Sequence, residues 1–174
     1  MRIYLLGFMG AGKSTRGPVV AERGGLGFLD LDEEIAGAAG RDIPQIFADE
    51  GEAGFRRRES EALRKAAARG DLVVATGGGI VEYEGNHDLL RQAHAVYLRW
   101  TWEQLWRRLA NRRGDRPLLE EGEAAMRARW RRRERLYREF ARQELDMREA
   151  GQGERRQLLL AGLADRILAA AAEP

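Results

Sequence analysis

The sequence predicts an α/β domain in which a parallel sheet carries a phosphate-binding loop. Residues 7–15 read Gly-Phe-Met-Gly-Ala-Gly-Lys-Ser-Thr, directly after the apolar run 3–6 and before a helical pattern. Strand and helix patterns then alternate along the chain, which is typical of parallel strands covered by helices on both faces. At 174 residues the chain has the usual length of one domain, so we expect a single domain over residues 1–174.

The first two strands flank one helix. The run at 2–6 predicts the first strand, and residues from about 13 to 23 predict a helix. Pro18 lies in the interior of this helix, where it removes one backbone hydrogen bond and should bend the helix or shift its start. A brief second strand is expected at 27–30.

Two helices are expected next. Asp42, followed at once by Ile43 and Pro44, is typical of an N-cap with proline in the first turn, and it opens a short helix that ends at Glu50. A longer helix follows from about residue 52 to residue 69, and Gly70 is expected to end it as a C-cap.

The second half of the chain continues the alternation. The fully apolar run 72–75 predicts a third, buried strand, and 95–99 predicts a fourth. The remaining patterns predict three helices and one polar loop that contains Pro117. The helices are expected at 101–112, at about 123–144 and at 158–172, and the loop is expected at 113–122.

Charge, cysteine content and hydropathy exclude several classes of protein. The 30 basic and 28 acidic residues leave a formal net charge of +2, whereas a general nucleic-acid-binding protein is expected to carry a larger positive excess. The absence of cysteine excludes disulfides and thiol chemistry. The sequence contains no recognisable signal peptide and no apolar run of membrane-spanning length, so a soluble cytoplasmic protein is expected.

The glycine loop is expected to bind the phosphates of a nucleotide. Glycines let the backbone curl so that successive N–H groups point inward, and the start of the following helix adds partial positive charge. Lys13 would reach the β- and γ-phosphates, and the Ser14 hydroxyl would hold Mg²⁺. Lys13 and Lys65 are the only lysines among 30 basic residues, which indicates that this site needs a slim ammonium group. The alternative is a glycine-rich turn that happens to precede a helix.

A pair of carboxylates follows the second strand. The second strand ends in Asp30-Leu31-Asp32, and strand periodicity places both carboxylates on one face, at the sheet edge where α/β proteins bind ligands and near the P-loop strand. One carboxylate would support Mg²⁺ through its water shell, and the other would accept a proton or a hydrogen bond from a substrate hydroxyl. Alternatively, Asp32 only caps the helix that begins at Glu33.

Two arginines lie on helix faces that are otherwise apolar. Arg56 and Glu59 share the side of their helix that carries Leu63, and pairing with Glu59 would hold the guanidinium ready for a substrate carboxylate. The alternative is an ordinary surface ion pair. Arg133 is the second candidate for an anion clamp, because a charge in an apolar stripe is costly unless it meets an anion. The other members of its stripe are Met126, Trp130, Tyr137 and Phe140.

Two further segments suggest contacts with a ligand. Thr76-Gly77-Gly78-Gly79 follows a buried strand and offers bare backbone at the sheet edge, which favours a binding surface over a flexible turn. Arg116-Pro117-Leu118-Leu119 suggests a lid over about residues 112–122. Arg116 would stabilise the charge on transferring phosphates while the lid excludes water.

Taken together, these motifs resemble those of the shikimate kinase family, from the P-loop to about Asp146. The resemblance implies a P-loop kinase fold of the nucleoside-monophosphate-kinase type, with a five-stranded parallel sheet flanked by helices, usually as a monomer. It implies ATP-dependent phosphorylation of the shikimate 3-hydroxyl, in the route to chorismate and the aromatic amino acids. The motifs are Gly-Phe-Met-Gly-Ala-Gly-Lys-Ser-Thr at Gly7, Leu-Asp-Leu-Asp at Leu29, Phe-Arg-Arg at Phe55, Gly-Gly-Gly at Gly77, Arg-Pro-Leu-Leu at Arg116 and Arg-x-x-Leu-Tyr at Arg133.

The resemblance also implies a role for each motif residue. Asp32 would hydrogen-bond the substrate hydroxyls and act as the base, within a substrate-binding region at about 32–62, and Arg116 would be the lid arginine that also touches ATP. The substrate carboxylate would be gripped by Arg56 and Arg133, helped by the backbone of Gly77, Gly78 and Gly79. ATP and Mg²⁺ would be held by Gly10, Ala11, Gly12, Lys13, Ser14 and Thr15, with Asp30 in the magnesium shell.

The chain departs from the family pattern at a few positions, and two other functions compete. Pro18 replaces an ordinary helical residue, Met147 stands where threonine is common, and the adenine-side arginine would be Arg107, Arg108 or Arg112. A gluconate kinase would share the P-loop but would not require both clamp arginines. A nucleotide sensor or nucleic-acid binder would use the arginine-rich stretch 127–138, which Glu134 interrupts. We expect a small-molecule substrate, and neither nucleic acid nor a membrane as partner.

Overall fold

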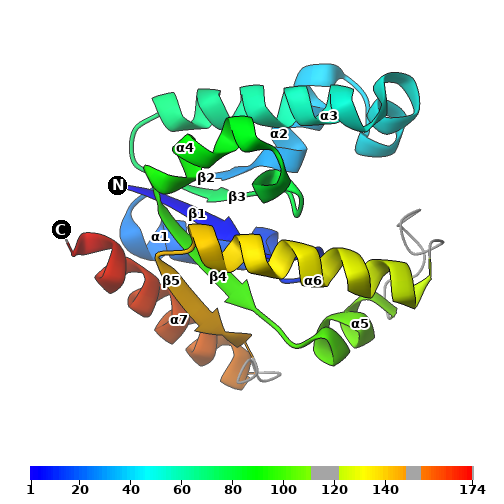
Figure 1. Ribbon diagram of the computed structural model, residues 1–174. Coiled ribbons are helices and arrows are strands. Elements are labelled where there is room, and N and C mark those ends of the chain that lie inside the picture. Colours follow the sequence, from blue (N-terminus) through cyan, green and yellow to red (C-terminus); the bar gives the residue numbers. More distant parts are fainter. Residues whose placement is uncertain (111–121, 148–153, 174) are drawn as a thin grey trace.

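A computed structural model describes residues 1–110, 122–147 and 154–173 of the chain (Figure 1). The expected lid at about 112–122, including Arg116, therefore lies outside the described residues except for Gly122. Arg112, one of the three candidates for the adenine side, lies outside them as well.

The centre of the molecule is a five-stranded parallel sheet with the strand order β2-β3-β1-β4-β5. This order confirms the predicted fold class. β3 stands between β2 and β1, so the Asp30 strand is one strand removed from the P-loop strand. The strands are β1 (Arg2–Leu6), β2 (Gly27–Asp30), β3 (Leu72–Ala75), β4 (His94–Arg99) and β5 (Gln143–Asp146).

β1 lies in the middle of the sheet and is buried on both faces. Tyr4 pairs with Val74 of β3 on one side and with Ala95 of β4 on the other, and all three residues are buried. Continuous apolar runs of this kind are typical of parallel strands that helices cover on both sides. The P-loop therefore follows directly from the buried central strand of the sheet.

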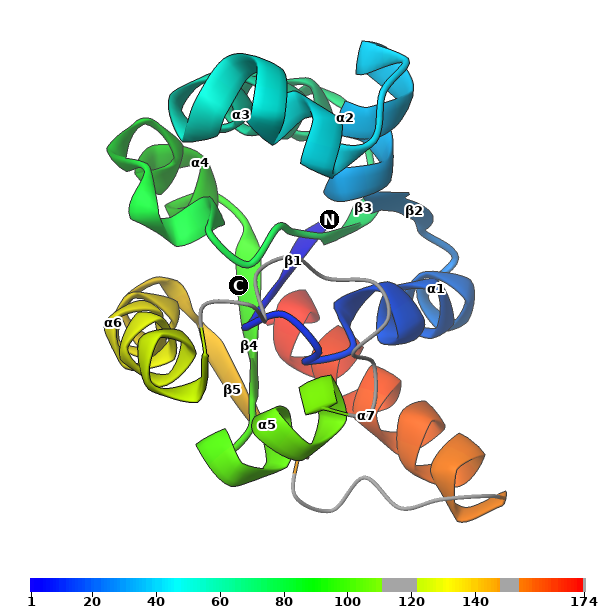
Figure 2. The same cartoon turned by 90° about the vertical axis from the view of Figure 1, so that its right-hand side faces the viewer.

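Helices cover both faces of the sheet (Figure 2). α1 (Lys13–Gly24) and α7 (Glu154–Ala172) pack side by side on one face. α4 (His87–Arg91) and α6 (Glu123–Phe140) lie on the other. Beyond the β2 end of the sheet, α2 (Leu31–Ala39) packs against α3 (Ile43–Ala68). α5 (Trp102–Ala110) follows β4, and the short 3₁₀ helices η1 (Ile80–Glu82) and η2 (Glu84–Asn86) follow β3.

A proline in α1 and two glycines in or after α3 bear on the predicted bounds of these helices. α1 begins at Lys13 and continues through Pro18, so the proline does not shift the start of the helix. α3 is kinked at Gly51, whose non-helical φ of 68° and ψ of −179° separate the two expected helices. Its cap is Arg69 in an extended conformation, and Gly70 is not left-handed, so the predicted glycine C-cap is wrong.

The boundaries near the C-terminus also differ. The helix expected at about 123–144 ends at Phe140, because Ala141 turns to an extended conformation and Gln143–Asp146 pairs with β4 as a strand. α7 begins at Glu154, four residues before the expected start at 158. In the part of the chain that the structure describes, no helix is long and apolar enough to cross a bilayer.

Candidate active site

The P-loop lies between β1 and α1 and presents a helix start that no side chain caps. Gly10 and Gly12 have φ values of 78° and 87°, a left-handed conformation that other residues rarely adopt. Gly12 is the N-cap of α1 without a side-chain hydrogen bond, and the first turn carries no acidic residue. The helix start therefore keeps its partial positive charge for an anion, beside the exposed Ser14 and Thr15.

Lys13 is almost buried within this loop. Its Nζ atom donates hydrogen bonds to the carbonyl oxygens of Gly7, at 2.7 Å, and Phe8, at 3.2 Å. The ammonium thus lies inside the curl of the loop, at the position from which a lysine reaches bound phosphates.

Cationic and aromatic side chains hold the loop from outside. Trp100 Nε1 donates to the carbonyl oxygen of Ala11 at 3.0 Å, and Arg108 Nε donates to that of Gly10 at 2.9 Å. Arg108 lies over the Trp100 ring at 4.6 Å from its centre. By contrast, Arg107 is exposed and donates to the carbonyl oxygen of Glu103 in its own helix. Of the adenine-side candidates, Arg108 is thus a P-loop contact and Arg107 is not.

The prediction that Asp30 and Asp32 lie on one face of a strand is wrong. β2 ends at Asp30, whose carboxylate caps α2 by accepting a hydrogen bond from the backbone N–H of Asp32 at 3.0 Å. Asp32 lies in the first turn of α2 and is exposed. Strand periodicity therefore failed here, because Asp30 itself starts the helix. The alternative in which Asp32 is the cap is also wrong, since Asp30 takes that place.

Arg56 is held by carboxylates of its own helix, as predicted. Its Nη1 donates to Glu59 Oε2 at 2.7 Å, and its Nη2 donates to Glu52 Oε1 at 3.2 Å. The Glu59 side chain is fully buried, while Arg57 is exposed. Burial raises the pKa of Glu59; Arg56 opposes this shift, and the nearby negative charge of Asp32 adds to it. Arg56 and Glu59 thus form a largely buried ion pair and not an ordinary surface ion pair.

The glycine run after β3 approaches the predicted substrate residues closely. A Cβ atom on Gly77 would lie 2.2 Å from Glu59 Oε1 and 3.2 Å from Asp32 Oδ1. A Cβ atom on Gly79 would lie 2.3 to 2.6 Å from the guanidinium of Arg56. Gly77 and Gly79 therefore cannot carry a side chain without displacing these groups.

Gly78 connects this run to the P-loop and to α6. A Cβ atom on Gly78 would lie 3.4 Å from the backbone nitrogen of Met9 and 3.7 Å from Arg133 Nη1. The Tyr137 hydroxyl donates a hydrogen bond to the Gly78 carbonyl oxygen. The carboxyl edge of the sheet thus brings together four segments that were singled out separately in the sequence: the P-loop, the start of α2, Arg56 and Arg133.

Arg133 lies on the buried stripe of α6 and meets an anion, as its position required. Its Nε donates to Oε2 of Glu82 at 2.7 Å, and only 7% of its side chain is exposed. Met126, Tyr137 and Phe140 of the same stripe are buried as well. Sequence analysis missed Glu82, because it lies 51 residues from Arg133 and no local pattern links the two residues.

The residues proposed for Mg²⁺ fit a hard cation in part. Ser14 offers an exposed hydroxyl at the start of α1, and Asp30 offers a carboxylate at the end of β2. Oxygen ligands of this kind suit Mg²⁺, which usually keeps several waters and binds through phosphates. Among residues 1–110, 122–147 and 154–173, no cluster of three or more His, Asp or Glu side chains is arranged to hold a metal.

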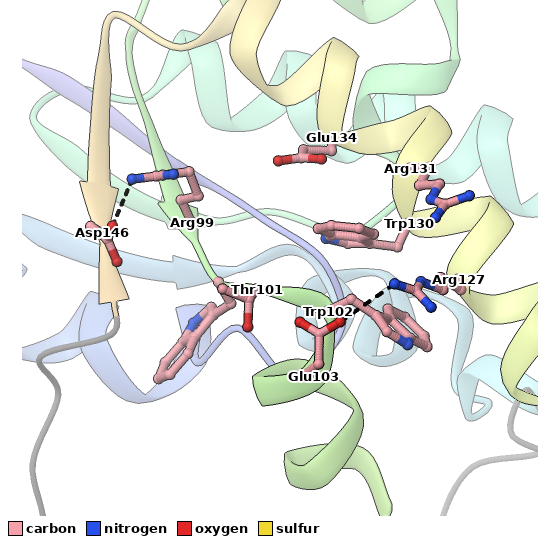
Figure 3. Close-up of a pocket in the computed structure, with 10 residues that line it drawn as sticks. Arg99, Thr101, Trp102, Glu103, Arg127, Trp130, Arg131, Glu134 and Asp146 are labelled. Atoms are coloured by element: carbon pink, nitrogen blue, oxygen red, sulfur yellow. Dashed lines mark hydrogen bonds and ion pairs between the residues drawn. The ribbon is translucent and has the colours of Figure 1, made fainter.

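The helices on either side of residues 111–121 are fastened to each other (Figure 3). Trp102 Nε1 donates to Glu123 Oε1 at 3.0 Å, and Arg127 pairs with Glu103 at 3.4 Å. Between β4, α5, α6 and β5 lies a cavity of about 210 Å³, whose lining includes Trp130 and Arg131. None of the predicted site residues lines this cavity.

Comparison with known proteins gives a consistent family. Residues 9–169 match the family model "Shikimate kinase". A shikimate kinase of Chlorobium limicola is 48% identical over 119 residues, which cover 68% of this chain and 59% of that protein. A bifunctional shikimate kinase/3-dehydroquinate synthase of Thermotoga maritima is 42% identical over 142 residues, covering 82% of this chain and 28% of the relative. These matches span less than two thirds of either relative.

Solved structures agree with this result. A shikimate kinase from Acinetobacter baumannii in complex with shikimate has a TM-score of 0.85 and 40% identity, covering 99% of this chain and 95% of that one. A gluconokinase from Sinorhizobium meliloti has a TM-score of 0.55 at 20% identity and covers 98% of this chain and 91% of that one, so its similarity concerns the fold alone.

Proposed function

The chain belongs to the shikimate kinase family, and from this membership we propose that it transfers the γ-phosphoryl group of ATP to the 3-hydroxyl of shikimate. The products would be ADP and shikimate 3-phosphate, in the route to chorismate and the aromatic amino acids. The observation that carries the proposal is the Gly77–Gly79 run, which lies against Arg56, Arg133 and the P-loop together.

The acid end of the substrate is assigned to two arginines. Arg56 and Arg133 come from different helices and approach the same glycine run, at Gly79 and Gly78 respectively. A carboxylate between them would accept hydrogen bonds from planar guanidinium groups, which bind carboxylates better than lysine does. Gly77 and Gly79 let Glu59 and the Arg56 guanidinium pack directly against the backbone of the run, so that the substrate would meet bare backbone beside these groups. This arrangement supports a small carboxylic acid as the phosphate acceptor.

The phosphate end is assigned to the P-loop. The uncapped start of α1 and the buried Lys13 support binding of the β- and γ-phosphates, with the backbone from Gly10 to Thr15 as the cradle. Mg²⁺ would be held by the Ser14 hydroxyl directly and by Asp30 through the water molecules of the ion. It would neutralise charge on the transferring group. Arg116, which lies outside the described residues, is proposed as the lid arginine.

Asp32 is proposed as the base. It is exposed at the edge of the sheet, and its carboxylate faces the glycine run on which the substrate would lie. In this role Asp32 accepts the proton of the 3-hydroxyl as that oxygen attacks the γ-phosphorus and the bond to the ADP oxygen breaks. Phosphoryl transfer needs little covalent chemistry from the protein, so most of the acceleration would come from positioning and electrostatics.

The remaining expectations are also part of the proposal. We propose a single catalytic domain that acts as a cytoplasmic monomer on a small molecule, without nucleic acid or a membrane as partner. The pairing of α6 arginines with acidic residues supports this view, because Arg138 pairs with Glu134 of the same helix and Arg132 and Arg133 pair with Glu82 of η1.

The decisive experiment measures ADP release from MgATP with shikimate, with gluconate and with neither acid. The proposal expects strong stimulation by shikimate alone. Stimulation by gluconate alone would contradict shikimate as the substrate and would instead indicate a gluconate kinase of the same fold. Binding of ATP without stimulation by either acid would reject the kinase assignment in favour of a nucleotide sensor.

A further inference from the structure

Glu82 joins the glycine run to two successive arginines of α6. It is the last residue of η1, three residues after Gly79. Its Oε2 accepts from Arg133 Nε at 2.7 Å, while its Oε1 accepts from Arg132 Nε at 2.7 Å and lies 2.6 Å from Arg132 Nη2. Only 17% of the Glu82 side chain is exposed.

The contact with Arg133 uses a particular atom of the guanidinium. Glu82 takes Nε, on the inner side of the group, and leaves the edge formed by Nη1 and Nη2 out of this contact. Nη1 lies 3.7 Å from the position of a Cβ atom on Gly78. The edge that can bind a carboxylate with two parallel hydrogen bonds therefore faces the glycine run.

Arg56 is held differently. Both of its terminal nitrogens contact carboxylates, since Nη1 donates to the buried Glu59 and Nη2 donates to Glu52. A substrate carboxylate would have to replace Glu52, which is 69% exposed, at the terminal edge of Arg56. Glu82, by contrast, contacts Arg133 at Nε, so this ion pair does not have to break when a carboxylate binds the terminal nitrogens of Arg133.

The single charge of Glu82 is shared between two arginines. Glu82 carries one negative charge and meets two guanidinium groups. Burial alone would raise the pKa of Glu82, but the charges and hydrogen bonds of Arg133 and Arg132 hold it below its ordinary value. Glu82 is therefore ionised at neutral pH and offsets one of the two guanidinium charges that it meets, while the buried Glu59 also interacts electrostatically with Arg133.

We propose that Glu82 is a positioning residue for the carboxylate of the substrate: it fixes Arg133 through Nε so that the two terminal nitrogens face the glycine run. This inference rests on the proposed function. Glu82 touches neither the reacting atoms nor the P-loop in this role, and it acts only through Arg133. Removing Glu82 should therefore change substrate affinity and leave the phosphoryl-transfer step alone.

The test compares Glu82→Ala and Glu82→Gln with the wild-type protein, measuring kcat, the KM for shikimate, the KM for ATP and the melting temperature. Glu82→Ala is expected to raise the KM for shikimate roughly tenfold, the size expected for a lost hydrogen bond to a charged group. The values of kcat and of the KM for ATP are expected to stay close to wild type. The KM for shikimate of Glu82→Gln should lie between those of the wild type and Glu82→Ala, because the amide oxygen can still accept a hydrogen bond from Arg133.

A double-mutant cycle separates positioning from a general structural effect. In an Arg133→Ala background, Glu82→Ala is expected to add no further rise in the KM for shikimate, since its target is gone. Glu134→Ala is the matched control, because it removes an ion pair with Arg138 on the same helix without touching Arg133. This control should leave the KM for shikimate unchanged.

Three results would overturn the inference. They are an unchanged or lowered KM for shikimate in Glu82→Ala, an effect that adds fully to that of Arg133→Ala, and an equal fall of kcat in both Glu82 variants. If Glu82→Ala does not fold, Glu82→Gln decides by the same criteria. A wild-type protein without shikimate-dependent ADP release would instead reject the proposed function and this inference with it, so the two failures are distinguishable.

Discussion

The guanidinium of Arg133 lies over the ring of Phe8, with its central carbon 5.8 Å from the ring centre. Phe8 belongs to the P-loop, and Arg133 belongs to a helix more than a hundred residues later. The buried Phe8 ring thus connects the P-loop to the helix that carries Arg133, the arginine proposed for the substrate carboxylate. The proposed phosphate site and the proposed carboxylate site use separate residues, so variants should affect them separately.

Arg133→Ala is expected to raise the KM for shikimate by roughly 10- to 100-fold, because charged hydrogen bonds to the carboxylate are lost. The KM for ATP should change much less, since Arg133 is not among the residues proposed to bind the nucleotide. Steady-state kinetics with each substrate varied in turn measures both values. Arg135→Ala, an exposed position on the same helix, serves as the control. Equal effects on both substrates would contradict the carboxylate assignment.

Asp32→Asn is expected to reduce kcat by roughly 10²- to 10⁴-fold, the range found for a general base. The amide keeps the size of the side chain but cannot take the proton of the 3-hydroxyl. Single-turnover rates with saturating shikimate and MgATP measure the effect. Glu33→Gln, the exposed neighbour in the same turn, should be close to wild type. Near-normal turnover of Asp32→Asn would remove Asp32 from the role of base.

Lys13→Arg is expected to reduce turnover roughly 100-fold or more, as is usual when a donor to transition-state charge is lost. The reason is size, because Nζ of Lys13 fits against the carbonyl oxygens of Gly7 and Phe8, where a planar guanidinium does not. Lys65→Arg is the matched control, since Lys65 is the other lysine of the chain and pairs with Glu61 on the surface. An active Lys13→Arg enzyme would show that charge alone is enough at this position.

Gly79→Ala is expected to raise the KM for shikimate about tenfold with little change in the KM for ATP, because the new methyl group displaces the Arg56 guanidinium from its place beside Glu59. Gly37→Ala provides the comparison, since no atom lies within 4 Å of its new Cβ. This helical substitution should leave kinetics unchanged and stabilise the fold by about 0.5–1 kcal/mol. If Gly79→Ala binds both substrates normally, the glycine run is not needed to place Arg56.

Glu50 should give the fold a measurable dependence on acid. Hydrogen bonds from Arg58 and Arg41 lower the pKa of Glu50 to about 2, from an ordinary value of 4.5. A carboxylate whose pKa is lower in the folded state contributes stability above pH 4.5 and loses that contribution as the pH falls toward 2. The stability difference between wild type and Glu50→Gln, measured by urea unfolding, should therefore be larger at pH 6 than at pH 3. A difference that does not change with pH would contradict this account.

Glu22→Gln is the control for that measurement. Glu22 is exposed on α1 and has no ion pair among the residues that the structure covers. The wild-type protein and this variant should show the same small difference at both pH values.

Patterns within one helix or strand were predictable where the cause is local. Arg56 and Glu59 are three residues apart, so helix geometry alone brings them together. Gly51, between two helical patterns, marks a break because its φ of 68° is unfavourable for other residues. The spacing of the α6 stripe placed Arg133 correctly for the same reason.

Features that depend on distant partners were not predictable. Glu82 meets Arg133 only because the turn after β3 lies against α6. The predicted helix extended to about residue 144 and so covered the first two residues of the strand Gln143–Asp146. Four residues without strong alternation carry little signal, and pairing with β4 makes them a strand. Asp32 was given a strand position because Asp30 can end a strand or begin a helix, and the cap prevailed.

The strand order sets a schedule for synthesis of the chain. β1 lies between β3 and β4, and its first partner in sequence is Leu72–Ala75, about seventy residues later. A ribosome must therefore release nearly half of the polypeptide before the glycine loop gains a neighbouring strand. Until then the apolar side chains of β1 and β2 are exposed, and the backbone of both strands is unpaired. We expect protection by chaperones, or slow translation, to matter most while this first half emerges.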